Sequence, residues 1–399
     1  MPPNSNSLVK EVFKTRSAPR KKISTIFSQM FPAPDALIQK DTSSGGKRMD
    51  LYPAAVEWGS NSIKLIQLAK STRGPEIAKA VYFPLGRPLP PAAEIRNLVV
   101  KILKDQQIKS QAAMTLPLSQ IRTFTFVLPF MPEEEIEQAV LWKLKQTLPQ
   151  EMASETVTFD FVPCFPKTGG ASREIKVLVF LADKGRILEL MKFFQSHGLK
   201  LLAVEPESYS VFTSLLWAQK LGVQETSLLL HLGAGESSLT VMHSQQPYWM
   251  KPLGFSGNAL TDAIAASRQM DWQKAEMFKK QEGLNSWKPG ASAGAGPEAA
   301  ILSQLENLVV DVEHAFRTFT QQIGKTEING FQKVILSGGT AGLPNLEKFF
   351  ADRLDVPVEI HDPFESLPEV SGQGASSVIK DNPGRFASVL GLAVRFLEW

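Results

Sequence analysis

The chain has 399 residues, more than one hydrophobic core usually accommodates, so two domains are expected. Apolar residues make up 43% and charged residues 21%, which is ordinary for a globular protein, and the formal net charge of +3 gives no sign of a polyanionic partner. The sequence has no apolar run of about 18 residues that predicts a membrane-spanning helix, no apolar signal core at its N-terminus, and a single cysteine, Cys164, which excludes an intrachain disulfide and fits the cytoplasm.

Residues 1–50 predict a flexible basic arm. Serine and proline are interspersed there with basic side chains, and the segment DTSSGGKR leads into the first expected strand. A solvated tail without a role is one interpretation. The other is weak attraction to anionic lipid, at roughly 1 kcal/mol per basic residue near the surface, with the run ISTIFSQMF forming a short amphipathic helix. The basic residues in the first half of the arm are Lys10, Lys14, Arg16, Arg20, Lys21 and Lys22.

Regular elements are expected after Pro53. A helix at 95–106 is predicted by apolar residues at helical spacing, and another at 187–197 ends before Gly198. The strands predicted from alternation or from short buried runs lie at residue 56 and at 63–68, 77–82, 112–117, 121–130, 156–165 and 174–182.

The clearest helix of the first half covers residues 132–148. Pro132 suits its first turn, and the three glutamates at 133–135 face the positive end of the helix dipole. Lys143 and Lys145 lie near the other end. One apolar stripe, which should face a sheet, consists of Ile136, Val140, Leu144 and Leu148.

The second half repeats the strand, turn and strand pattern. LLLHLGAGESSLTV at 228–241 predicts such a unit, and the segment GFSGNALTDAIAASRQM predicts a loop that enters a helix. Residues 283–298, rich in glycine, alanine, serine and proline, predict a mobile loop. The remaining expected elements are a strand at 247–252, a helix at 299–323, a strand in KVILSGG, a helix in LPNLEKFFADRL, and a final helix at 386–397.

Small residues follow the first strand of each half. EWGSNSIKLIQL and HLGAGESSLTV each place glycine and small polar residues at a sharp bend, and a third turn contains Gly338 and Gly339. Backbone N–H groups at such bends can surround phosphate oxygens. One glycine turn is usually only a hairpin turn, but a repeated pair predicts two α/β lobes that face a nucleotide across a cleft.

These segments resemble the actin-like ATPase superfamily, and within it the FtsA/PilM branch. EWGSNSIKLIQL is similar to the first phosphate loop, AVEPES at 203–208 to the first connecting segment, HLGAGESSLTV to the second phosphate loop, and LSGGTAGLPNLEKFFADRL to the adenosine loop with its helix. The insert at 121–182, with LPFMPEEEIEQAVLWKLKQTLP, resembles the relocated small subdomain of FtsA and PilM proteins. FSGNALTDAI, VEIHDPF and ASVLGLAVRFL favour the PilM family of type IV pilus assembly proteins.

The resemblance implies an α/β actin-like (ribonuclease H-like) fold of two lobes with an inserted subdomain. Residues 51–120 and 183–210 would form the first lobe, 121–182 the inserted subdomain, and 211–399 the second lobe, with the helix at 386–397 packing back on the first lobe. ATP and Mg²⁺ are the implied cofactors. The implied nucleotide-binding residues are Gly59, Ser60, Asn61, Ser62, Lys64, Gly233, Ala234, Gly235, Gly338, Gly339 and Thr340.

The resemblance also implies partners. The family binds the N-terminal cytoplasmic tail of PilN, a bitopic inner-membrane protein, which would hold the chain at the cytoplasmic face of that membrane beside the pilus motor ATPases and the platform protein. We expect the tail to lie in a groove between the first lobe and the insert. The groove residues would be Leu98, Ile102, Phe124, Phe126 and Leu128. Homo-oligomerisation is a further expectation.

The sequence departs from the superfamily where Mg²⁺ is expected. The family usually has aspartate two residues before each loop glycine, but this chain has Glu57 and His231. Glutamate keeps the charge, so Glu57 stays the candidate metal residue, whereas neutral imidazole is a poor ligand for hard Mg²⁺. Hydrolysis should therefore be impaired, although the backbone of the loops could still bind a nucleotide.

Several site residues carry two interpretations. Glu205 would position the attacking water, or it is an exposed glutamate before Pro206. Lys64 would face phosphates or solvent, and Thr340 adds bulk near the expected adenine, where the family often has glycine. Asn61 and Ser62 would donate to phosphate or only form the turn, and His231 could be a satisfied histidine inside a sheet.

Three functions remain in view. The first is an adaptor of the pilus platform with little or no ATP hydrolysis, the second an active ATPase that drives platform assembly, and the third an actin-like component of a type II secretion platform. Loss of the second aspartate favours the adaptor over the ATPase. A Walker A motif, HExxH, G-x-S-x-G, metal-ligand spacing and a basic-aromatic stripe for nucleic acid are all missing from the sequence.

Overall fold

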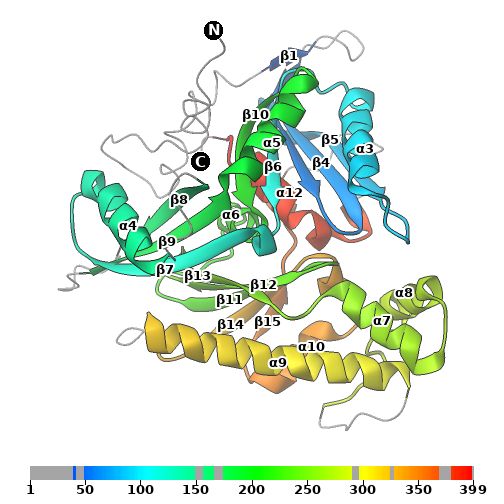
Figure 1. Ribbon diagram of the computed structural model, residues 1–399. Helices are drawn as coiled ribbons and strands as arrows, with labels where there is room; N and C mark the ends of the chain where they lie inside the picture. Colours follow the sequence, from blue (N-terminus) through cyan, green and yellow to red (C-terminus); the bar gives the residue numbers. More distant parts are fainter. Residues whose placement is uncertain are drawn as a thin grey trace.

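A computed structural model describes residues 39–41, 49–148, 156–165, 174–289, 296–323, 328–367 and 379–397. Most of the predicted arm at 1–50 lies outside these ranges, as do residues 290–295 of the predicted mobile loop. Within the arm, β1 (Gln39–Asp41) and β2 (Met49–Leu51) pair antiparallel. The described chain forms two lobes, drawn one above the other in Figure 1.

The upper lobe in Figure 1 is built on a seven-stranded sheet. Its strands follow the order β1-β2-β4-β3-β6-β10, and β5 pairs with β4. The bounds are β3 (Ala54–Trp58), β4 (Ser62–Ser71), β5 (Gly74–Pro84), β6 (Gln111–Leu116) and β10 (Lys200–Pro206). Neighbouring residues of β3 enter different cores because side chains alternate along a strand, with Val56 beside helix α3 (Ala92–Asp105) and Ala55 beside the C-terminal helix.

The lower lobe has a five-stranded sheet in the order β13-β12-β11-β14-β15. β11, β12 and β13 are antiparallel, whereas β14 and β15 run parallel to β11. The strands are β11 (Thr226–Leu232), β12 (Ser237–His243), β13 (Gln246–Leu253), β14 (Lys333–Ser337) and β15 (Val358–Ile360). The helices are α7 (Gly257–Arg268), α8 (Trp272–Gln281), α9 (Pro297–Gln322) and α10 (Leu346–Leu354).

A three-stranded sheet, in the order β7-β9-β8, forms the inserted subdomain. It contains β7 (Ile121–Pro129), β8 (Val157–Cys164) and β9 (Glu174–Asp183), and is followed by α5 (Lys184–Ser196). Helix α4 (Glu133–Thr147) covers one face, with Ile136, Val140 and Leu144 buried against it as the apolar stripe predicts. On β7, the hydroxyls of Thr123 and Thr125 donate to backbone carbonyls of β13, which joins this sheet to the lower lobe.

Two buried helices, α6 (Glu207–Trp217) and α12 (Ala387–Val394), pack against each other in the centre of the molecule. Helix α6 contacts strands of both large sheets, and α12 contacts β3, β4 and β6. Their backbones approach closely because Gly391 has no side chain: an added Cβ would overlap the carbonyl oxygen of Ser210. The predicted lobe boundary between residues 210 and 211 falls inside α6, so this helix belongs to neither lobe alone.

Single turns connect several of these elements. They are η2 (Leu118–Gln120), η3 (Gly339–Gly342) and η4 (Pro383–Phe386). The first joins β6 to β7, the second follows β14, and the third leads into α12.

Candidate functional site

The two glycine turns close the ends of β3 and β11. In the first, the N–H of Gly59 donates to the carbonyl of Ser62 at 3.0 Å, and in the second, the N–H of Gly233 donates to the carbonyl of Glu236 at 3.1 Å. A Cβ at Gly233 would overlap that carbonyl oxygen, so the second bend requires glycine. Each turn thus joins two antiparallel strands, as the sequence predicts.

The structure brings these two turns into direct contact. A Cβ at Gly235 would overlap the Ser60 hydroxyl, so the side chain of Ser60 lies against the second turn. The amide of Asn61 donates to Asn258 Oδ1 at 2.7 Å, and the Asn258 amide donates back to Asn61 Oδ1 at 3.1 Å. Asn258 lies in the first turn of α7, so a reciprocal amide pair connects the two lobes.

The third turn completes the cluster. Gly338 has φ +91°, and a Cβ there would lie 2.5 Å from the carbonyl oxygen of Leu232. Thr340, in η3, lies so close to Gly257 that a Cβ on that glycine would overlap its hydroxyl. The N–H groups of Gly257 and Asn258 donate to the carbonyls of Gly233 and Ala234. All three predicted turns therefore meet at the N-terminus of α7.

Glu57 is buried, with 3% of its surface exposed, and both of its carboxylate oxygens have partners. Lys64, which pairs with it across the β3–β4 ladder, forms an ion pair with Oε1. The hydroxyl of Ser388, in α12, donates to Oε2. Lys64 therefore faces neither open solvent nor an empty space but the carboxylate beside the first turn.

His231 binds a carboxylate that the sequence interpretation had not assigned. Its Nε2 lies 3.0 Å from Oε1 of Glu207, the first residue of α6, while its buried Nδ1 has no hydrogen-bond partner. Burial opposes ionisation of Glu207, but the hydrogen bond and charge of His231, together with Lys64, hold the pKa of Glu207 below its usual range. Glu207 lies within AVEPES, where the sequence argument considered only Glu205.

Glu205 is buried, with 2% of its surface exposed. It forms an ion pair with Arg395, just after α12, and accepts a hydrogen bond from the Ser210 hydroxyl at 2.6 Å. Burial raises the pKa of Glu205 against the opposing effects of Arg395 and Ser210. The residue predicted to position water is thus engaged in a buried pair that ties β10 to the C-terminal segment.

Comparison with known proteins identifies the family. A family model described as type IV pilus assembly protein PilM matches residues 55–397. The chain belongs to the PilM family. A chain of the solved PilM–PilN type IV pilus biogenesis complex is 22% identical, with a TM-score of 0.71, over 87% of this chain and 99% of that one. The predicted fold class, actin-like with an inserted subdomain, is confirmed.

Lower similarity extends to other proteins of solved structure. Ethanolamine utilization protein EutJ from Carboxydothermus hydrogenoformans is 13% identical with a TM-score of 0.48, over 86% of this chain and 89% of that one. MreB5 of Spiroplasma citri bound to ADP is 12% identical with a TM-score of 0.48, over 86% of this chain and 95% of that one.

Among the described residues, no helix is long and apolar enough to span a membrane.

Mg²⁺, which the PilM-type fold implies together with ATP, does not fit the side chains beside the two glycine turns. A hard cation needs carboxylate, carbonyl or water oxygens, but Glu57 is occupied by Lys64 and Ser388, and His231 by Glu207. The described residues contain no group of three or more histidine, cysteine or acidic side chains that could hold a metal. The Ser60 side chain of the first turn lies against Gly235 of the second turn.

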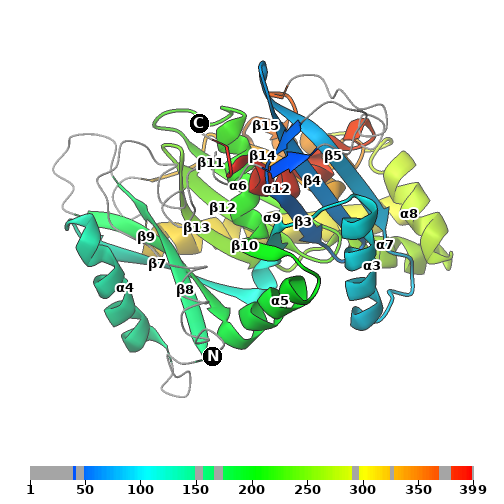
Figure 2. The same ribbon diagram turned by 90° about the horizontal axis from the view of Figure 1, so that it is seen from above.

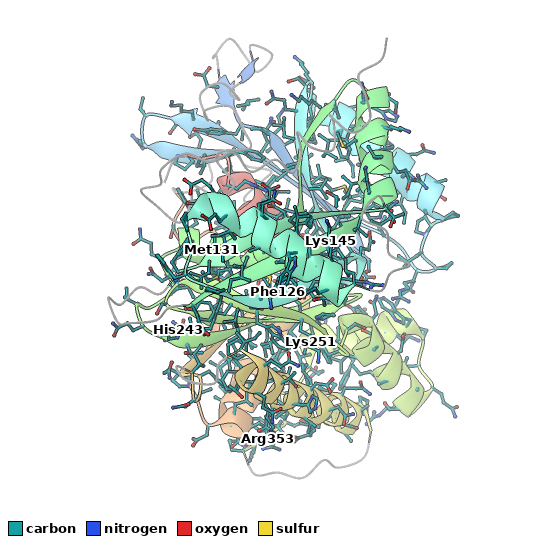
Figure 3. All side chains as sticks on the ribbon, turned by 60° about the vertical axis from the view of Figure 1, so that its left-hand side comes forward. Phe126, Met131, Lys145, His243, Lys251 and Arg353 are labelled. Atoms are coloured by element: carbon teal, nitrogen blue, oxygen red, sulfur yellow. The ribbon has the colours of Figure 1, made fainter. Side chains whose placement is uncertain are left out.

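The five residues predicted for the partner groove do not come together. Ile102 is buried in the core of the upper lobe, and Leu98 of the same helix is half-buried against that core. Leu128 is buried under α4, where Phe124 and Phe126 stack with ring centroids 5.9 Å apart. Figure 3 shows Phe126 below α4, between Met131 and Lys145 at the two ends of the helix. Figures 1 and 2 both place α3 and β7 on opposite sides of the molecule.

Another surface lies where the insert meets the upper lobe. A cavity of about 30 Å³ there is lined by residues of β8, β9, β10 and α5, among them Thr158, Asp160, Ile187 and Val204. Figure 2 shows β8 between α4 and α5. In the described part of the chain β8 is a terminal strand of its sheet, and its residues 157–159 are half-buried, whereas residues 160–164 are buried.

Proposed function

We propose that the chain is an adaptor of the type IV pilus platform at the cytoplasmic face of the inner membrane, where it binds the N-terminal tail of a PilN-like protein. Membership of the PilM family supports the pilus role. The solved relative is a complex of PilM with PilN, which supports the choice of partner. Contacts with the motor ATPases and the platform protein, and self-association, belong to the same proposal.

The observation that carries the adaptor role is the pairing of His231 with Glu207. In the actin-like superfamily that the chain resembles, hydrolysis needs a carboxylate at each phosphate loop to organise Mg²⁺. Here the second loop offers an imidazole whose Nε2 is already bound 3.0 Å from a carboxylate, and the first carboxylate carries a lysine. No observation of comparable weight favours the ATPase alternative.

The first test measures phosphate release by the purified chain with Mg²⁺ and ATP. We expect turnover at the background rate, and no change in Glu205→Ala, because the carboxylate of Glu205 is already engaged by Arg395 and Ser210. Rapid turnover that Glu205→Ala abolishes would contradict the adaptor proposal and support an ATPase.

We further propose that the PilN-like tail lies along the half-buried first part of β8, residues 157–159, beside the cavity between insert and upper lobe. An extended peptide can add a strand to the edge of a sheet, while a pocket accepts one of its side chains. The cavity of about 30 Å³ has room for a methyl-sized group at the tip of an aliphatic side chain. The proposed location is still the junction between the insert and the first lobe, as expected from the sequence. Its residues differ from the five that were predicted for the groove.

The second test titrates a labelled tail peptide into two variants. Thr158, half-buried on β8, lines the cavity, so Thr158→Glu should weaken binding at least tenfold by placing a charge in an apolar site. Leu98→Glu on α3 should bind like the parent chain. Thermal melts check that both variants fold. Normal binding by Thr158→Glu together with loss of binding by Leu98→Glu would instead place the tail at the α3 surface.

A further inference from the structure

We propose that the two lobes are held closed by direct contacts around the mouth of their cleft, and that these contacts and a bound Mg²⁺–nucleoside triphosphate exclude one another. The contacts, called here the interlobe clamp, are the Asn61–Asn258 amide pair, the packing of Ser60 on Gly235, and the stacking of Arg87 on Trp272. The inference does not depend on the partner tail.

The third contact lies outside the glycine turns. Arg87, in the loop between β5 and α3, places its guanidinium carbon 4.8 Å from the ring centroid of Trp272, the first residue of α8. A guanidinium over an indole face is attractive even at an exposed site such as this loop. The indole Nε1 of Trp272 is buried without a hydrogen-bond partner, although the residue as a whole is half-buried. The clamp therefore joins the upper lobe to both α7 and α8.

The clamp uses the positions that an anion would need. The N-terminus of a helix attracts phosphate through its free N–H groups, but on α7 those of Gly257 and Asn258 already donate to the second turn. Ser256 accepts from the N–H of Ala259 at 3.1 Å. A triphosphate between the turns would have to displace the Ser60 side chain and part the two asparagines. Opening of the clamp is thus a precondition for nucleotide entry.

The charged side chains of the cleft also oppose the binding of a triphosphate. Glu207 lies beside the second turn with its pKa held below the usual range, which keeps a negative charge near the place of the phosphates. Lys64, on the strand that follows the first turn, is already paired with Glu57. In the closed arrangement Lys64 pairs with Glu57, and His231 pairs with Glu207. A triphosphate would bring further negative charge close to both glutamates, which is unfavourable.

The test measures the distance between the lobes with two spin labels. Lys101→Cys on α3 and Gln281→Cys at the end of α8 are exposed positions, and native Cys164 is buried, with its thiol pKa raised by that burial. In the parent chain we expect a narrow distance distribution that millimolar Mg²⁺ and a non-hydrolysable ATP analogue leave unchanged. A parent distribution that shifts with the analogue would overturn the proposal.

The clamp variants are Arg87→Ala, Asn258→Ala and their combination. Each should broaden the distribution and bind the Mg²⁺–analogue complex at least tenfold more tightly than the parent, as measured by equilibrium dialysis. Arg87 is exposed on a loop, so its variant should fold even if the combination does not. Matched controls within the lower lobe are Arg353→Ala, which removes a stacking contact with Phe349, and Asn285→Ala. Clamp variants that match these controls in distance and affinity would also overturn the proposal.

Discussion

At the scale of single residues, the two side chains that precede the glycine turns, Glu57 and His231, are buried, and each is held by a residue of a helix. The turns at Gly59 and Gly233 and the departures at Glu57 and His231 follow from spacing and residue type. The partners of those residues do not, because Ser388 lies 331 residues from Glu57 in the sequence and Glu207 lies 24 residues from His231, each in a helix. A buried polar side chain needs a partner, but only the three-dimensional arrangement identifies it.

Asp160 gives a prediction at this scale. It lines the cavity beside β8, and burial raises its pKa to about 7 against the opposing hydrogen bond from the N–H of Phe161. The folded chain therefore binds an extra proton between about pH 4 and pH 7, so the free energy of unfolding falls as pH rises through that window. Asp160→Asn should remove this fall, a difference of about 3 kcal/mol between pH 4.5 and pH 8 in denaturant titrations.

Exposed Asp105, at the end of α3, offers a control for that experiment. Asp105→Asn should keep the pH dependence of the parent chain. An Asp160→Asn variant with the parent's dependence would show that the carboxyl is ionised in the folded chain.

At the scale of elements, most strands and helices were predictable because their exposed faces are polar. Helix α4 is an example, with a buried stripe and charged residues opposite it. Helix α6 was not predicted, because serine, threonine and apolar residues are buried on almost every side of it and leave no amphipathic pattern. Periodicity also cannot tell which core an apolar face enters, which is why Leu98 and Phe124 were assigned to one groove although they lie in different parts of the fold.

The contact between α6 and α12 gives a prediction at the scale of elements. Gly391→Ala places a Cβ against the carbonyl oxygen of Ser210, and both helices are too enclosed to move apart freely. We expect a loss of about 3 kcal/mol or more in the free energy of unfolding, measured by denaturant titration. At Gly330 an added Cβ meets nothing within 4 Å, so Gly330→Ala should change stability little. Equal effects at the two glycines would contradict the described packing.

At the scale of the whole molecule, the fold follows from repeated α/β units and a recognisable insert, and the family match covers residues 55–397. The state of the cleft could not be predicted in this way. Glycine turns that look open to phosphate in the sequence are closed against each other, because Ser60, Asn61 and Asn258 belong to segments that meet only in the folded chain.

The central claim is that the chain binds a PilN-like tail as an adaptor, independently of ATP turnover. The most direct measurement is a calorimetric titration of the N-terminal peptide of a PilN-like protein into the full chain, with and without Mg²⁺ and ATP. We predict saturable one-to-one binding with a Kd that changes less than twofold between the two conditions. Absence of binding, or binding that appears only with Mg²⁺ and ATP, would contradict the account.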